Sequence, residues 1–144
     1  MNRDEIKQIL PHREPMLLVD EMDMDEERVA HAKYTVKGDE WFLQGHFPGN
    51  PVVPGVVLCE IIGQSCAILL GDELNGHTPF FTGMNKVKFK HTARPGDTLD
   101  VTARITRRNG PFFITEGKAM IGDRLAVQGE FSFALIDNTE AATK

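Results

Sequence analysis

The chain contains one long apolar segment, residues 56–71, in which apolar side chains fall on nearly every side of a helix. A helix that is apolar all round is buried rather than laid on a surface. After it the pattern changes to the alternation expected of strands, with strand-like runs at residues 80–92, 97–107, 112–121 and 125–136. Residues 108–111 and 122–123 carry the Gly, Asn, Asp and Pro residues that favour hairpin turns between the last three runs.

Shorter elements are predicted before the long helix. Residues 3–10 favour one or two helical turns, residues 16–24 and 28–36 a strand pair around an acidic turn, and residues 39–42 a helical turn. Residues 45–55 carry prolines at positions 48, 51 and 54, a spacing that neither a helix nor a sheet accommodates.

One helix is buried completely only if a curved sheet wraps it or a partner subunit covers what remains. We therefore expect an α+β domain in which five or six mostly antiparallel strands surround a central helix. The composition agrees with a single globular domain over residues 1–144, because 41% of the residues are hydrophobic and 26% are charged.

The charge and the apolar segments exclude several classes of protein. A net charge of −5 argues against a nucleic-acid binder. Glu60 and Gln64 interrupt the longest apolar run, which is short for a membrane span, and the N-terminus has no signal-peptide core. Cys59 and Cys66 would lie about 10.5 Å apart along a helix, too far for a disulfide. A reducing, cytoplasmic location is therefore expected.

Three candidate groups converge at the start of the long helix. His46 lies in the stiff proline-rich segment, where a functional side chain is held on a rigid scaffold. Glu60 is a carboxylate among aliphatic neighbours, so it needs a partner or a cleft, and Gln64 lies one turn further on the same helix face. Gly55 opens the helix with unpaired N–H groups that suit an oxygen gaining negative charge.

Together these groups supply a base, an acid and an oxyanion site, a set that suits proton abstraction beside a carbonyl. Apolar walls are expected from Phe47, Val52, Val53 and Val57. The sequence has no Ser or Cys nucleophile beside a base, no glycine-rich phosphate loop and no metal-ligand cluster, so neither a metal nor a cofactor is expected.

The segment LQGHFPGNPVVPGVVLCEIIGQ, residues 43–64, resembles the active-site signature of the FabZ-type beta-hydroxyacyl-acyl carrier protein dehydratases. Residues 9–13, 15–20, 84–89 and 94–97 resemble further segments of that family, whereas Glu14 stands where the family commonly has an aromatic residue. The resemblance implies a hot-dog fold, in which an antiparallel sheet wraps a long helix. It also implies a homodimer with two shared active sites, often assembled as three dimers.

Carried over by position, His46 matches the family's catalytic histidine and Glu60 its catalytic carboxylate, while the Gly55 N–H binds the thioester carbonyl. The implied reaction removes a proton from C2, and Glu60, supported by Gln64, positions or protonates the leaving C3 hydroxyl. One of the two catalytic residues could also serve both steps. Phe80 matches a tyrosine that acts as a lid, and Phe47 and Val56 are further expected substrate-binding residues.

The sequence is also compatible with two other functions, a hot-dog acyl thioesterase and a non-catalytic acyl-thioester-binding module.

For the dehydratase, the resemblance implies an acidic acyl carrier protein as partner. Binding an acidic partner needs a local basic surface on this chain, whose net charge is also negative. Lys86, Lys88 and Lys90 alternate along one predicted strand and are expected on one face. Arg94 is expected to join this surface, with Arg104, Arg107 and Arg108 as further members.

The proline-rich segment also bears on where His46 and Glu60 meet. If it were straight, residues 46–55 would span about 28 Å at polyproline geometry, and turns at Gly49 and Asn50 would shorten that span. Hydrogen-bond contact between His46 and Glu60 within one chain is therefore not the default expectation, and the family resemblance implies that they pair across the dimer.

Overall fold

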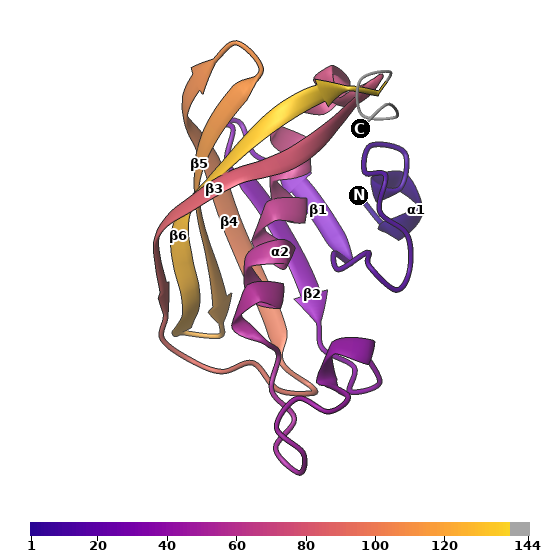
Figure 1. Cartoon of the computed structure of the whole chain (residues 1–144), viewed down its shortest axis with the longest axis vertical. Coiled ribbons are helices and arrows are strands. Elements are labelled where there is room, and N and C mark those ends of the chain that lie inside the picture. Colours follow the sequence, from indigo (N-terminus) through magenta and orange to yellow (C-terminus); the bar gives the residue numbers. More distant parts are fainter. Residues whose placement is uncertain (139–144) are drawn as a thin grey trace.

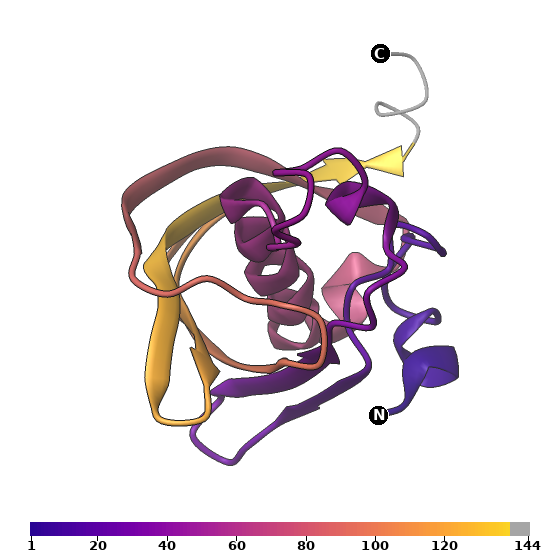
Figure 2. The same cartoon turned by 90° about the horizontal axis from the view of Figure 1, so that it is seen from below.

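A computed structural model of the chain describes residues 1–138, and the strands in this range form one antiparallel sheet curled around a central helix (Figures 1 and 2). The sheet order is β1-β2-β4-β5-β6-β3. The strands are β1 (Glu21–Met24), β2 (Ala30–Thr35), β3 (His77–Phe89), β4 (Thr98–Asn109), β5 (Phe112–Ile121) and β6 (Arg124–Asp137). This is the hot-dog arrangement, so the predicted α+β fold is confirmed.

The helical elements are α1 (Arg3–Ile6), α2 (Gly55–Ser65) and the 3-10 turns η1 (Trp41–Leu43), η2 (Cys66–Leu69) and η3 (Gly71–Leu74). The helix predicted over residues 56–71 is therefore α-helical only as far as Ser65. The Ser65 hydroxyl donates to the Ile61 carbonyl at 2.7 Å, and such a side-chain bond competes with the helical pattern. None of these helices is long and apolar enough to cross a bilayer.

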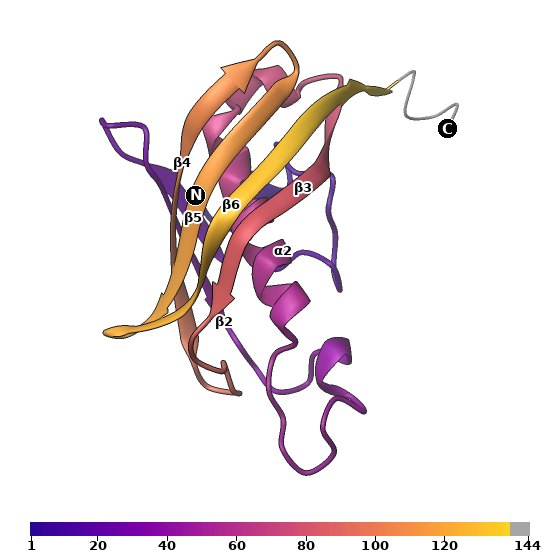
Figure 3. The same cartoon turned by 60° about the vertical axis from the view of Figure 1, so that its left-hand side comes forward.

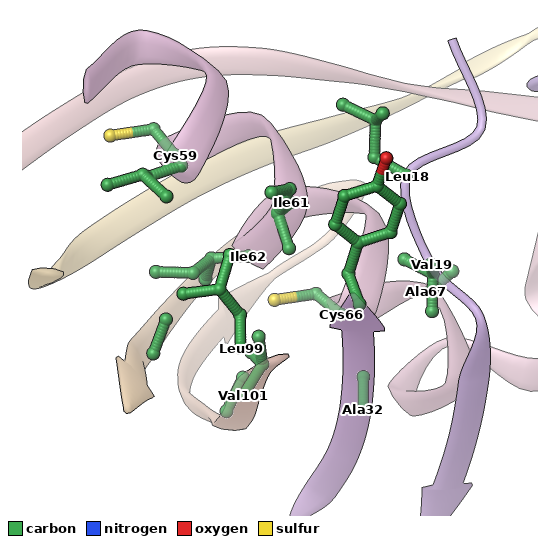
Figure 4. Close-up of a cluster of buried hydrophobic side chains, with 14 of the residues drawn as sticks. Leu18, Val19, Ala32, Cys59, Ile61, Ile62, Cys66, Ala67, Leu99 and Val101 are labelled. Carbon is green, nitrogen blue, oxygen red and sulfur yellow. The ribbon is translucent and has the colours of Figure 1, made fainter. Parts of the chain in front are cut away.

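The inner surface of the sheet and the apolar face of α2 form the core. Ile61 and Ile62 are fully buried, and Figure 4 places them in one cluster with Leu99 and Val101 of β4. Burying each such side chain contributes roughly 1.5–3 kcal/mol. The helix and the sheet approach each other closely at Gly117 of β5. A Cβ atom at this position would lie only 2.5 Å from Ile62 Cγ2.

The two hairpins after β4 are as predicted, and β5 has the predicted bounds. Gly110 and Gly122 adopt positive φ values of 60° and 61°, which glycine adopts without strain. The first predicted strand is much shorter than expected. Residues 16–20 run beside α2 instead, where the Leu18 N–H donates to Gln64 Oε1 at 2.8 Å.

β3 lies at the end of the sheet order, as Figure 3 shows, and begins three residues earlier than predicted. Phe80, expected at the very start of this strand, therefore lies within it. One edge of β3 pairs with β6, and the other has no strand partner within residues 1–138. Nearly all of β3 is exposed, including four large apolar side chains, namely those of Phe80, Phe81, Met84 and Phe89.

Candidate active site

The imidazole of His46 is held in one orientation by the proline-rich segment. Its Nδ1 atom lies 2.9 Å from the Val52 carbonyl oxygen. Because a carbonyl only accepts hydrogen bonds, Nδ1 carries the hydrogen in the neutral ring, and Nε2 is left as an unprotonated acceptor. The Phe47 ring stacks on the imidazole at 4.2 Å between centroids. The arrangement leaves His46 able to accept a proton at Nε2.

The segment folds back on itself instead of running straight. The Asn50 N–H donates to the Phe47 carbonyl at 2.8 Å, which closes a tight turn, and Val53 is tied to the Ala93 carbonyl at 2.8 Å. The straight span of about 28 Å therefore does not apply, and a turn is present at the expected position, around Gly49 and Asn50. The turn returns His46 to the start of α2.

His46 and Gly55 line the same groove, which we call the His46 groove. Gly55 and Val56 are the first residues of α2, so their N–H groups have no acceptor within the helix. A Cβ atom at Gly55 would lie 3.0 Å from the Phe89 ring, so a larger residue there would require the exposed Phe89 side chain to shift. The groove residues are His46, Phe47, Val52, Val53, Gly55, Leu58, Phe89, Lys90, His91 and Thr92.

Glu60 lines a second, mostly apolar cavity, which we call the Glu60 pocket. Its carboxylate is partly exposed, and its Oε2 atom accepts a hydrogen bond from Gln64 Nε2 at 2.9 Å. The pocket residues are Leu10, His12, Glu60, Gly63, Gln64, Cys66, Ala67, Leu70, Pro79, Phe81, Ile105, Phe113, Thr115 and Phe133. The pocket joins the carboxylate to apolar space between α2 and the sheet.

The Gln64 side chain is 2% exposed, and three hydrogen bonds hold its amide group in one orientation. Its Nε2 donates to Glu60 and to the Met16 carbonyl, and its Oε1 accepts from the Leu18 N–H, both backbone contacts at 2.8 Å. The predicted Gln64–Glu60 contact is present. The two contacts with residues 16–18 were not predicted, and they hold Gln64 rigidly.

Within one chain, His46 and Glu60 lie in separate cavities that share no lining residue. Helix geometry explains the separation. Glu60 follows Gly55 by five residues, which is about 7.5 Å along the axis and about 140° around it. One chain therefore presents the His46 groove on one side of α2 and the carboxylate on another.

The cysteines of the helix are not nucleophiles in this setting. Cys59 and Cys66 are free and buried. Burial raises the pKa of the Cys59 thiol and raises that of Cys66 to about 12, so both remain protonated near neutral pH. Within residues 1–138, no group of three or more His, Cys, Asp or Glu side chains is placed to hold a metal ion.

The remaining predicted substrate contacts have different positions. Phe47 lines the His46 groove and is 58% exposed, with a positive φ of 53°. Val56 is 75% exposed at the helix start, and Phe80 is 47% exposed on β3. Phe81, which was not predicted, lines the Glu60 pocket and stacks on Phe133 at 4.9 Å.

The predicted basic surface is interrupted by a β-bulge in β3. The register with β6 shifts between Asn85 and Lys88, and Lys86 adopts a φ of 56°. The alternation expected for residues 86, 88 and 90 therefore does not hold. Lys86 lies 3.8 Å from Glu130, whereas Lys90 lies beyond the strand in the His46 groove.

The arginines around this surface have local partners. Arg94 Nη1 donates to Asn50 Oδ1 at 2.6 Å, which ties it to the turn that carries His46. Arg104 pairs with Glu116 at 3.1 Å, and Arg108 pairs with Glu73. Lys88 is exposed and forms no ion pair within residues 1–138.

His12, Gly63 and Phe81 belong to the Glu60 pocket but were not singled out from the sequence. Gly63 lies three residues after Glu60, so helical spacing places the two on adjoining parts of one face. His12 belongs to a segment that resembles the dehydratase family. It is 48 positions away from Glu60 in the sequence, so local sequence patterns do not predict that the two side chains meet.

Comparison with known proteins agrees with the fold and the signature. A family model described as a FabA-like domain matches residues 10–130. A 3-hydroxyacyl-acyl-carrier-protein dehydratase FabZ from Natranaerobius thermophilus is 41% identical over 137 residues, covering 93% of this chain and 96% of that protein. A FabZ of the same description from Clostridium perfringens is 43% identical, covering 94% and 99%.

Solved structures support the architecture. The dehydratase heterocomplex ApeI:P from Xenorhabdus doucetiae aligns with a TM-score of 0.78 at 19% identity, over 96% of this chain and 95% of that one. A mutant of the fluoroacetyl-CoA-specific thioesterase FlK aligns with a TM-score of 0.71 at 17% identity, over 86% and 95%. At these identities the likeness concerns the fold alone. The family model and the long, closely matched relatives go further, and they place this chain in the FabA-like family.

Proposed function

We propose that the protein is a beta-hydroxyacyl-acyl carrier protein dehydratase, which converts its substrate to a trans-2-enoyl thioester and water. The FabZ relatives support this reading, because they match nearly the whole chain at 41–43% identity. The observation that carries it is the His46 groove, where an imidazole with a free Nε2 lies in the same groove as the open N-terminus of α2.

The thioester carbonyl oxygen binds at the Gly55 N–H, where the start of the helix stabilises the negative charge that forms on the oxygen. His46 Nε2 removes a proton from C2, and the C–H electrons form the C2–C3 double bond. The C3–O bond breaks, and Glu60, which enters this step as the neutral acid, positions the departing hydroxyl and gives it the proton with which it leaves as water. His46 then releases the proton taken from C2 to solvent, and Glu60 takes up a proton from solvent.

Each site takes its histidine and its carboxylate from different subunits of a homodimer. The 140° between Gly55 and Glu60 around α2 keeps the two groups apart in one chain. The free edge of β3 and its exposed apolar side chains offer a surface for a second copy. A trimer of such dimers is part of the same proposal.

The substrate arrives on an acidic acyl carrier protein in fatty acid or related acyl-chain biosynthesis, in the cytoplasm. The docking surface includes Lys88 and Arg94, with Lys86 beside them. Long-range attraction of this kind raises the association rate, and it weakens as salt screens the charges.

The test is the product formed from a beta-hydroxyacyl carrier-protein thioester. A dehydratase yields enoyl thioester, which absorbs in the ultraviolet, and releases no free thiol. A hot-dog thioesterase would instead release thiol without enoyl product. Binding with neither product would indicate a non-catalytic module, and either of these results would contradict the proposal.

A further inference from the structure

His12 lies between α1 and β1, and its ring lines the Glu60 pocket. Its Nε2 atom is 3.4 Å from Glu60 Oε2, the same oxygen that accepts the hydrogen bond from Gln64. Two nitrogen atoms from separate parts of the chain therefore converge on one carboxylate oxygen. The other oxygen, Oε1, has no hydrogen-bond partner within residues 1–138.

We infer that His12 is a positioning residue for Glu60, an inference that rests on the proposed dehydratase function. The terminal torsion of a glutamate is broad, so a carboxylate with one partner can still turn. With Gln64 and His12 both on Oε2, the group is fixed and Oε1 is the oxygen that meets the C3 hydroxyl. Fixed orientation of a reacting group accelerates the step that uses it.

The distance fits a contact that tightens when the site is filled. At 3.4 Å it exceeds a normal hydrogen bond, and catalytic contacts are often long before substrate binds. The side chains of Glu60 and His12 are both only about a quarter exposed, so water competes incompletely for their contact.

The His12 ring has one nitrogen without a partner among the described residues. Its Nδ1 atom is buried and makes no hydrogen bond within residues 1–138, which costs free energy. Its surroundings are largely apolar, since Leu10, Leu70 and Phe81 line the same pocket. A leucine at position 12 would remove the unpaired nitrogen together with the contact to Glu60. A ring kept at this cost is explained by its effect on the carboxylate.

The experiment compares His12→Leu with His12→Gln in the full-length protein, using a beta-hydroxyacyl carrier-protein thioester. His12→Leu is expected to lower kcat about tenfold, to change KM less than about twofold, and to leave the melting temperature unchanged or raised. His12→Gln retains an N–H donor near the Nε2 position, so its kcat is expected within about threefold of wild type.

The matched control is His31→Leu. His31 also pairs with a carboxylate, since its Nε2 lies 2.8 Å from Asp25 Oδ2, but this pair is exposed at the turn between β1 and β2. Its loss is expected to leave kcat unchanged. His12→Met replaces His12→Leu, with the same expected result, if the leucine variant does not fold.

A second measurement asks whether His12 acts through Glu60. In a Glu60→Gln background, His12→Leu is expected to cause no further loss of the residual kcat, because the group it positions is gone. A further tenfold loss would overturn the inference. So would an unchanged kcat in His12→Leu, a loss confined to KM, or equal losses in the leucine and glutamine variants with a lowered melting temperature.

These outcomes are distinct from failure of the proposed function. A wild-type protein that forms no enoyl product would overturn both statements. An active wild type with an unaffected His12→Leu variant would overturn only the role of His12.

Discussion

His46 has its two ring nitrogens in different roles. The bond from Nδ1 to the Val52 carbonyl fixes the ring, and Nε2 is the atom left for chemistry. The expected consequence is that His46→Ala lowers kcat by at least about 100-fold, the scale of a general base. The lost hydrogen bond is worth only about 0.5–1.5 kcal/mol, so the melting temperature should fall little. Turnover and thermal unfolding of the same preparation check both parts.

His77 offers a matched control for this prediction. Its Nδ1 atom makes the same kind of bond, at 3.0 Å to the Asn75 carbonyl, but at the start of β3 and outside both cavities. His77→Ala is expected to keep wild-type turnover. Near-normal turnover in His46→Ala would remove His46 from the mechanism.

Among the elements, α2 and β5 pack so closely that only glycine fits between them. A Cβ atom at Gly117 would lie 2.5 Å from Ile62 Cγ2, and Ile62 is fully buried and has no room to move. Gly117→Ala is therefore expected to reduce the free energy of unfolding by about 1–3 kcal/mol, the usual cost of overpacking. Denaturant unfolding measures the change.

Gly83→Ala serves as the comparison, because it is also a strand glycine but a Cβ atom there meets nothing within 4 Å. Its stability should stay close to wild type. Equal unfolding free energies for the two variants would show that the contact between α2 and β5 is looser than described.

The surface beside β3 gives a second prediction at this scale. Lys88→Glu is expected to raise KM for carrier-protein substrates more than for small thioester mimics, and more strongly at low salt. Arg94→Glu should differ, because Arg94 also holds Asn50 in the turn that carries His46. We expect Arg94→Glu to lower kcat for both substrates, in addition to raising KM for the carrier-protein substrate. Equal effects of Lys88→Glu on the two substrates would contradict a docking role.

Local sequence signals account for the parts of the fold that were predicted correctly. Gly110 and Gly122 mark two hairpins, the alternation across residues 112–121 gives the bounds of β5, and helical spacing predicts the Gln64–Glu60 contact. The features that were missed depend on distant parts of the chain. They include the bonds from Gln64 to residues 16–18, the approach of His12 to Glu60, and the bulge at Lys86.

One error had a physical cause that periodicity does not report. An apolar run does not distinguish an α-helix from 3-10 turns, so the early end of α2 at Ser65 was not visible. In the proline-rich segment the turn expected around Gly49 and Asn50 is present, but its effect, which is to return His46 to the start of α2, could not be read from the sequence. The expectation that one chain cannot unite His46 with Glu60 rests instead on the geometry of α2.

At the scale of the whole molecule, the proposed active site depends on how two copies of the chain assemble. Val56 is 75% exposed on a helix that is otherwise packed, and the exposed apolar residues of β3 lie along the free sheet edge. Under the proposed shared site, a second copy that covers this surface supplies the Glu60 carboxylate to each His46 groove, and activity requires the dimer.

Complementation between two inactive variants tests this shared site most directly. His46→Ala and Glu60→Gln are each expected to be nearly inactive alone. In a mixed dimer, one site loses both groups and the other retains both. Random co-assembly of equal amounts makes half of the dimers mixed, so about a quarter of wild-type activity should return. Subunit exchange is verified by mass spectrometry of differently tagged chains. Verified exchange without any recovered activity would show that His46 and Glu60 do not act together across two subunits.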